Sequence, residues 1–319
     1  MGMASRQSVS GRSRERTCGD KNTGDKAMNI VWLGFGKMGE PMAARVAAAG
    51  HVLSVFDISE ERRTAARSRN LAVVESLEEA IARADVIVSS LPNDTVALHL
   101  LAGAGSVLRH AKPGALLIET STISVSASAS IANSADAHEI GYLRAPVSGS
   151  VVAAANGTLT TFVSGPDAVV DRAQPVVSAW ASTIRVMGDA EQARVMKLAV
   201  NLMVTTLVAS LGEAYALCTK GGIAPKAALD AISASAIGSP HLKFKADALE
   251  RLDFTPTFTV AQMRKDLKLI SDGARALSVP VLLGATVEQI MAATEASGFG
   301  DEDYLACAKV IAGLSGLAV

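Results

Sequence analysis

The sequence predicts an α/β domain built on a doubly wound parallel sheet, followed by an all-α domain. Up to about residue 190, short apolar runs alternate with helical patterns, which is typical of parallel strands covered by helices on both faces. Beyond that point only helical patterns remain. The length of 319 residues exceeds the usual size of one domain and agrees with two.

The composition narrows the classes of function. A net charge of −1 provides no electrostatic footprint for nucleic acid or an anionic membrane surface. No apolar run is long and uninterrupted enough to predict a membrane span. Cys18, Cys218 and Cys307 have neither metal-ligand spacing nor the pattern of a disulfide framework. We therefore expect a cytoplasmic protein without a metal site.

Residues 1–27 are polar and contain both basic and acidic side chains, with no apolar segment of the kind found in secretory signals. A transit peptide is an alternative, although the acids argue against it. We expect either a disordered tail or an over-called start site, with Met28 as the true beginning of the chain. The predicted boundaries are 1–27 for the tail, 28–190 for the first domain and 191–319 for the second.

A glycine-rich turn joins the first predicted strand, 29–33, to a helix at 41–49, and a second strand at 52–56 ends at Asp57. This order of strand, turn, helix, strand and acid is the context that the dinucleotide fingerprint G-x-G-x-x-G requires. The sequence therefore predicts a Rossmann-type domain. The turn residues expected to contact the cofactor are Gly34, Phe35, Gly36, Lys37, Met38 and Gly39.

Each glycine of the turn has a separate predicted role. Gly34 allows the tight turn, Gly36 lets the backbone approach a pyrophosphate, and Gly39 lets the helix pack on the strand. Asp57 can accept hydrogen bonds from the ribose hydroxyls of NAD and would repel the 2′-phosphate of NADP. We therefore expect NAD. Arg62 and Arg63 follow closely enough to leave NADP possible.

Two further predicted strands, 84–91 and 115–118, end in polar segments. Ligands of doubly wound sheets bind beyond the carboxyl ends of the strands. We therefore expect Leu91, Pro92 and Asn93 after one strand, and Ser121 after the other, to line the cofactor cleft. An alternative role for Ser121 is to cap the helix predicted at 123–137.

The second domain begins with a long predicted helix, 191–220, that carries Lys197 and Asn201. Residues four apart project from the same face of a helix, so an ammonium and a carboxamide leave an apolar helix together. A desolvated lysine is suited to proton transfer near neutral pH. On spacing alone, a lysine that lies along the surface beside a polar surface position is the preferred interpretation. Further helices are predicted at 225–236, 243–251, 260–277, 283–296 and 303–314.

Four segments, in order, resemble the 3-hydroxyisobutyrate dehydrogenase family, also called the β-hydroxyacid dehydrogenases. They are GFGKMGEPMA at 34–43, APVSGS at 145–150 with NGTL at 156–159, the helix with Lys197 and Asn201, and KDL at 265–267 with GFGDED at 298–303. Together they extend over nearly the whole chain from residue 29. The resemblance reverses the preference for a surface lysine.

The resemblance implies a role for each matching residue. Lys197 is similar to the family's general acid and base, and Asn201 to the partner that holds the substrate. Ser121 matches a serine that contacts the substrate's acid group, and Ser148 and Gly149 match a turn that binds its carboxylate. Lys265 matches a lysine near the nicotinamide end of the cofactor.

The chain departs from the family pattern near the carboxylate turn. Arg144 stands where the family usually has an acid, and Ser150 where it has a second glycine. The glycine-rich approach to the lysine helix is reduced to Gly188. Arg144 could contact an acidic substrate, but we expect it to point to solvent.

The expected protein is an NAD-dependent dehydrogenase or reductase of a small 3-hydroxy acid or its semialdehyde. Its partners would be a carboxylate-bearing substrate and further copies of itself, as a homodimer or homotetramer. Two alternatives remain. One is an imine reductase, although such enzymes generally lack the lysine, and the other is a cofactor-binding scaffold without catalytic activity.

Overall fold

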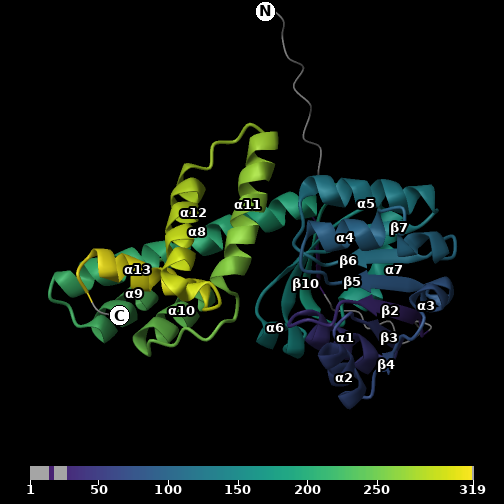
Figure 1. Cartoon of the computed structure of the whole chain (residues 1–319), viewed down its shortest axis with the longest axis horizontal. Helices are drawn as coiled ribbons and strands as arrows, with labels where there is room; N and C mark the ends of the chain where they lie inside the picture. The colour runs from purple at the N-terminus through teal and green to yellow at the C-terminus, as the bar shows by residue number, and fades with distance from the viewer. Residues whose placement is uncertain (1–13, 18–26, 318–319) are drawn as a thin grey trace, which may run out of the picture. The chain divides into compact units, whose positions relative to one another are not determined.

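The computed structural model describes residues 14–17 and 27–317 (Figure 1). Two compact units meet after Lys197, inside helix α8 (Gln192–Lys220). The predicted boundary at residue 190 lies slightly earlier, before the start of this helix. The first turn of α8 belongs to the first unit because Ala193 and Arg194 are buried there.

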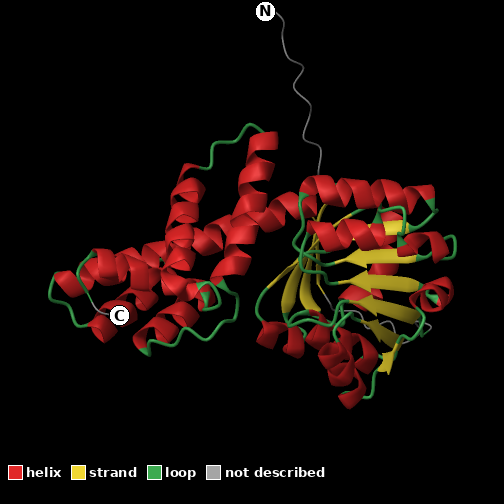
Figure 2. Ribbon diagram, viewed as in Figure 1, coloured by secondary structure: helices red, strands yellow, loops and turns green. Residues whose placement is uncertain are grey.

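A ten-stranded sheet forms the centre of the first unit (Figure 2). The order is β1-β10-β9-β7-β6-β5-β2-β3-β4, and β8 pairs with β9. The bounds are β1 Arg14–Thr17, β2 Asn29–Leu33, β3 Val52–Phe56, β4 Ala72–Val73, β5 Val86–Ser89, β6 Leu116–Glu119, β7 Gly141–Arg144, β8 Val147–Ser148, β9 Leu159–Ser164 and β10 Ala181–Gly188.

Six neighbouring strands of the sheet pair in parallel, as predicted. They are, in sheet order, β7, β6, β5, β2, β3 and β4. Their order is that of a dinucleotide-binding sheet, with the switch point between β2 and β5. At the other end the sheet is mixed, because β9 and β10 are parallel to each other but antiparallel to β7. The prediction of a doubly wound sheet is confirmed, while the antiparallel pairing is an addition to it.

Helices cover both faces of the sheet (Figure 1). Their bounds are α1 Gly39–Ala48, α2 Glu60–Ser68, α3 Leu77–Arg83, α4 Asp94–Leu101, α5 Val125–Ala137, α6 Val151–Asn156 and α7 Asp167–Val177. Alternate side chains of β2 point to opposite faces of the sheet and pack in two separate hydrophobic cores. Ile30 and Trp32 pack with α1 and α7, while Val31 and Leu33 pack with α3, α4 and α5. This division is what a central strand with period-two side chains predicts.

The second unit contains only helices among its described residues (Figure 2). After α8 they are α9 Pro225–Ala234, α10 Pro240–Glu250, α11 Val260–Ala276, α12 Leu282–Thr294 and α13 Cys307–Leu314. A buried ion pair ties the end of the unit together, with Lys245 Nζ 2.6 Å from Asp303 Oδ1. The second oxygen of Asp303 accepts hydrogen bonds from the backbone and hydroxyl of Thr257.

Part of the predicted tail is structured. Residues 14–17 form β1, which pairs antiparallel with the outer strand β10. An edge strand presents unpaired backbone groups, so it can accept another strand in this way. The expectation of a disordered tail is therefore wrong for these four residues, and residues 1–13 and 18–26 lie outside the described part of the chain.

Helix α8 is long and apolar enough to cross a membrane by length and composition alone, which the sequence argument did not anticipate. The same test is passed by central helices of globular cores. Val208, Leu211 and Tyr215 of α8 are buried in the core of the second unit. We therefore regard α8 as a packing helix of this unit.

Candidate cofactor and catalytic site

The glycine turn after β2 is held close to the neighbouring strand β5. Gly34 has a φ of +92°, and a Cβ there would lie 2.4 Å from the carbonyl oxygen of Ser90. A Cβ on Gly39 would lie 2.2 Å from the carbonyl oxygen of Gly34. Neither position can accept a side chain without moving backbone, so both glycines are required for the turn itself.

Gly36 differs from its two neighbours in the motif. A Cβ at this position would meet no heavy atom within 4 Å. The following helix α1 begins at Gly39, and its N-cap Met38 makes no side-chain capping hydrogen bond. The N–H groups at the start of α1 therefore suit the phosphate oxygens of a dinucleotide, and the residues present fit such a group.

Asp57 holds the turn from the end of β3. Its Oδ2 accepts a hydrogen bond of 2.7 Å from the backbone N–H of Phe35, and its Oδ1 accepts one of 2.8 Å from the N–H of Ser59. Each oxygen retains a further lone pair for a ribose hydroxyl. Arg63 Nη1 donates to the Asp57 carbonyl over 2.8 Å, and its guanidinium pairs with Glu60.

Ser121 lies two residues beyond the carboxyl end of β6, beside Leu91, which lies two residues beyond the end of β5. Its Oγ accepts a hydrogen bond of 2.7 Å from the backbone N–H of Leu91. The expected alternative, that Ser121 caps α5, is wrong. Ser124 is the cap, and its hydroxyl accepts from Ala127 N over 3.0 Å. Asn93 caps α4 by accepting from the N–H of Val96 over 3.0 Å. The structure thus brings two of the predicted edge residues, Ser121 and Leu91, into contact.

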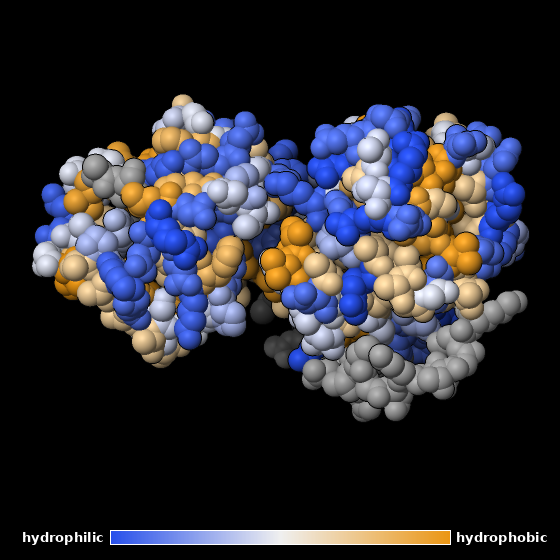
Figure 3. All heavy atoms as spheres, turned by 90° about the horizontal axis from the view of Figure 1, so that it is seen from below, coloured by the Kyte–Doolittle hydropathy of each residue, from blue (hydrophilic) through white to orange (hydrophobic). Residues whose placement is uncertain are grey.

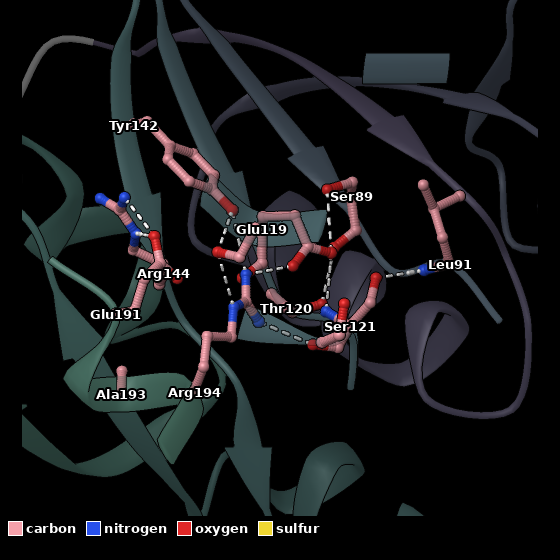
Figure 4. Close-up of polar contacts among 12 residues, drawn as sticks. Ser89, Leu91, Glu119, Thr120, Ser121, Tyr142, Arg144, Glu191, Ala193 and Arg194 are labelled. Atoms are coloured by element: carbon pink, nitrogen blue, oxygen red, sulfur yellow. Dashed lines mark hydrogen bonds and ion pairs between the residues drawn. The ribbon is translucent and has the colours of Figure 1, made fainter. Parts of the chain in front are cut away.

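A buried ion pair contacts the backbone of Ser121 (Figure 4). The guanidinium of Arg194, 1% exposed, contacts the carboxylate of Glu119, which is fully buried. Burial alone would lower the pKa of Arg194, but the charge of Glu119, acting together with Tyr142 and Glu191, raises this pKa above its ordinary value. Burial raises the pKa of the adjacent Tyr142 hydroxyl. Sequence reasoning missed this pair because its members are 75 residues apart.

Lys197 follows Arg194 by three residues in α8 and is half-buried. Residues at this spacing lie on neighbouring turns of one helix face. Because Arg194 Nη1 donates a hydrogen bond of 2.7 Å to the carbonyl oxygen of Ser121, the turn that carries Lys197 begins beside Ser121. Asn201 follows one turn later in the same helix, as predicted.

Asn201 is buried and points at a carboxylate that the sequence did not single out. Its Nδ2 donates to Asp266 Oδ2 over 2.7 Å. The other oxygen of Asp266 lies 2.9 Å from Nζ of Lys265 in an ion pair. Asp266 of α11 therefore joins two predicted site residues within the second unit. Its position beside Lys265 in the KDL segment was the only available signal.

The predicted carboxylate turn is formed by β8 and the residue after it. Ser148 pairs with Thr160 of β9, and Gly149 has a φ of +137°. L side chains rarely adopt this φ, so the position favours glycine, and a Cβ there would also lie 2.7 Å from a side-chain carbon of Leu159. Ser150 caps α6, with its hydroxyl accepting from Ala153 N over 3.2 Å.

The expectation that Arg144 points to solvent is wrong. Its side chain is buried and donates two hydrogen bonds to Glu191 Oε1, over 2.8 and 2.5 Å. The guanidinium also lies over the ring of Tyr142, 4.5 Å from the centroid (Figure 4). A buried arginine needs such partners because its charge is removed from water. Glu191 provides the opposite, negative charge.

Across residues 14–17 and 27–317, no three side chains among His, Cys, Asp and Glu are grouped so as to hold a metal ion. The candidate site is built from the glycine turn after β2, from Ser121 after β6 and from the helix that carries Lys197.

Two family models match the chain and together cover most of it. Residues 29–188 match the NAD-binding domain of 6-phosphogluconate dehydrogenase. Residues 192–311 match the NAD-binding domain of NADP-dependent 3-hydroxyisobutyrate dehydrogenase. The 2-(hydroxymethyl)glutarate dehydrogenase of Eubacterium barkeri is 31% identical over 296 residues, which are 92% of this chain and 98% of that enzyme.

Solved structures agree with these matches. Mycobacterium tuberculosis 3-hydroxyisobutyrate dehydrogenase, solved with L-serine, is 31% identical with a TM-score of 0.80, covering 90% of this chain and 99% of that one. An imine reductase from a Pseudomonas species has 19% identity and a TM-score of 0.59, covering 90% of this chain and 100% of that one. The second likeness shows a shared fold only.

Proposed function

Because this chain belongs to the 3-hydroxyisobutyrate dehydrogenase family of NAD(P)-dependent oxidoreductases acting on CH–OH groups, we propose that Lys197 is its general acid and base. The substrate class is a small 3-hydroxy acid or the corresponding semialdehyde. The observation that carries the proposal is the hydrogen bond from Arg194 to Ser121. It brings the turn of α8 that bears Lys197 to the strand edge where doubly wound sheets bind their ligands.

The nicotinamide cofactor supplies or accepts the hydride when it is bound. The proton is transferred by a side chain of the protein, Lys197. In reduction, the ammonium of Lys197 donates a proton to the carbonyl oxygen as negative charge develops there. In oxidation, the neutral amine removes the hydroxyl proton. The hydroxyl of Ser121 and the carboxamide of Asn201 orient the substrate, and the turn at Ser148 and Gly149 receives its carboxylate.

For the cofactor, we propose NAD in preference to NADP. Asp57 places a carboxylate at the end of β3, where the adenosine ribose binds in such sheets. The two nearby arginines already face acids, since Arg63 pairs with Glu60 and Arg62 Nη1 lies 4.0 Å from Glu40. Each arginine therefore already faces a negative charge, which would weaken its binding to a 2′-phosphate.

The remaining proposals concern the protein's environment. Large apolar side chains on the helical unit are exposed in the single chain, including Met203 and Leu217 of α8, which supports a homodimer or homotetramer. Cys218 and Cys307 are free thiols, which supports a cytoplasmic location.

The first prediction is that Lys197→Ala lowers kcat by about 10² to 10⁴-fold, the usual contribution of a positioned acid or base. The assay uses 3-hydroxyisobutyrate, 2-(hydroxymethyl)glutarate and L-serine with NAD and with NADP. Cofactor binding, followed by fluorescence of bound NADH, should change little. Lys268→Ala on α11 is the control, because this exposed lysine pairs only with Asp272 among the contacts described. Wild-type turnover in Lys197→Ala would disprove the assignment.

The same substrates separate the alternatives. An imine reductase would reduce cyclic imines with NADPH and leave the hydroxy acids unchanged. A cofactor-binding scaffold would bind NADH without turning over any compound on the panel. Oxidation of at least one hydroxy acid, with a kcat that falls in Lys197→Ala, distinguishes the proposed enzyme from both.

A further inference from the structure

The ion pair between Arg194 and Glu119 is unusually complete for a buried pair. Besides Glu119, the guanidinium donates to Ser121 O over 2.7 Å, Ser128 Oγ over 3.2 Å and Tyr142 Oη over 3.2 Å. Glu119 Oε1 in turn accepts from the backbone N–H of Ser121 over 2.8 Å. Both charges are thereby satisfied by the protein itself.

The contacts converge on one residue. Ser121 donates its N–H to Glu119 and receives Arg194 at its carbonyl oxygen, so its backbone is held from both sides (Figure 4). Its hydroxyl remains directed to Leu91 N at the neighbouring strand end. Arg194 itself lies in the first turn of α8, where Lys197 follows. The side chain of Arg194 thus links the backbone at Ser121 to the first turn of α8.

We propose that Arg194 and Glu119 are positioning residues that hold Ser121 and the Lys197 turn in the register needed for turnover. This inference rests on the proposed function for the role of Lys197. The pair does not itself contact the substrate or move the proton. Its effect is on the alignment of two groups that do, and misplacement by about 1 Å can cost on the order of 10²-fold in rate.

Stability alone is a weak explanation for the pair. Replacing a buried ion pair with apolar side chains of similar volume is often neutral for folding, whereas removing one partner leaves a buried charge. The double variant Glu119→Leu with Arg194→Met therefore removes the contacts that position Ser121 without leaving an unpaired buried charge. The melting temperature of the double variant should be closer to that of the wild type than the melting temperature of either single variant is.

The expected result for the double variant is a fall in kcat of about 10²-fold, with the KM for NAD little changed, measured with 3-hydroxyisobutyrate. Amide hydrogen exchange across residues 119–124 should also become faster, because Ser121 loses both backbone contacts. This second measurement does not depend on turnover. A wild type that oxidises no hydroxy acid therefore counts against the proposed function, while the exchange result still decides the inference.

The matched control is a second arginine–glutamate pair described in this unit, in which Arg144 is buried and Glu191 is half-buried. Arg144→Met with Glu191→Gln removes a pair of the same chemistry whose described hydrogen bonds do not reach Ser121. It should leave exchange at 119–124 and kcat close to wild type. An equal loss in this control would overturn the inference, because the effect would then belong to any buried pair.

Should the double variant not fold, Arg194→Lys decides the question. A lysine keeps the charge opposite Glu119 but lacks the planar fork needed to reach Ser121 as well. Reduced kcat with faster exchange at 119–124 supports the inference. Wild-type kcat and exchange in any folded variant that lacks the Ser121 contact would overturn it.

Discussion

Gly34 and Gly36 stand two residues apart in one turn but answer different physical requirements. Gly34 is required by the protein, because its φ of +92° and its 2.4 Å approach to the carbonyl of Ser90 exclude a Cβ. Gly36 has open space where a Cβ would point. Its requirement comes from the ligand that the turn would hold, since a dinucleotide phosphate must approach the backbone closely.

This contrast predicts opposite outcomes for two alanine substitutions. Gly34→Ala should lower the melting temperature by roughly 5 °C or more, since the backbone conformation alone costs about 1–3 kcal/mol. Gly36→Ala should melt like the wild type yet raise the Kd for NAD by about tenfold or more, which is about 1.4 kcal/mol. Thermal melts and NADH titrations measure the two effects. Unchanged NAD affinity in Gly36→Ala would argue against a phosphate at this turn.

The two glycines, the acid after β3 and the lysine helix could all be predicted, because each lies in a short local pattern. The partners of the charged residues could not. Glu119 and Arg194 meet across 75 residues, and Arg144 finds Glu191 across 47. Nothing in the spacing of such residues indicates which opposite charge will face them after folding. The solvent-exposed placement expected for Arg144 was wrong for this reason.

At the scale of elements, periodicity predicted some strands and helices better than others. The strands β2 and β3 begin and end as predicted, because buried parallel strands form continuous apolar runs. The mixed end of the sheet was not predicted. In strand β10 only Ala181 and Ile184 are buried, so the strand lacks a continuous apolar run, and its pairing with β9 depends on tertiary contacts rather than on local pattern.

Buried hydrogen bonds join helices α8 and α11 in the second unit, and one of them involves Asn201. Asn201 donates to Asp266 over 2.7 Å, which leaves the carboxamide oxygen of Asn201 as the group that can accept from a substrate hydroxyl. The assignment of nitrogen and oxygen follows this hydrogen bond. Asp266 therefore orients Asn201 although it lies on a different helix.

A double-mutant cycle tests this orientation. Asn201→Ala and Asp266→Ala should each lower kcat/KM, and the double variant should be little worse than either. The expected coupling is about 0.5–3 kcal/mol, as found for residues in direct contact. Asp272→Ala on the same helix is the control, because its exposed pair with Lys268 is distant in the chain from Asn201. Additive losses would show that Asp266 acts separately from Asn201.

At the scale of the whole molecule, the distribution of apolar side chains bears on assembly. Both polar and apolar side chains are visible on the face shown in Figure 3, with apolar ones in small groups. In the single chain, Met203 and Leu217 of α8 are 73% and 75% exposed, and Leu282 and Leu283 of α12 are 78% and 69% exposed. Met203 and Leu217 lie about four turns apart on nearly the same face of α8.

These exposed residues predict that the wild type is a dimer or tetramer and that Met203→Glu with Leu283→Glu dissociates it. Charged side chains in an apolar interface would be desolvated without partners. Sedimentation velocity at micromolar concentration measures the change. Val152→Glu is the control, because Val152 is 67% exposed but lies on α6 of the first unit. A monomeric wild type, or dissociation by the control alone, would contradict assembly through the helical unit.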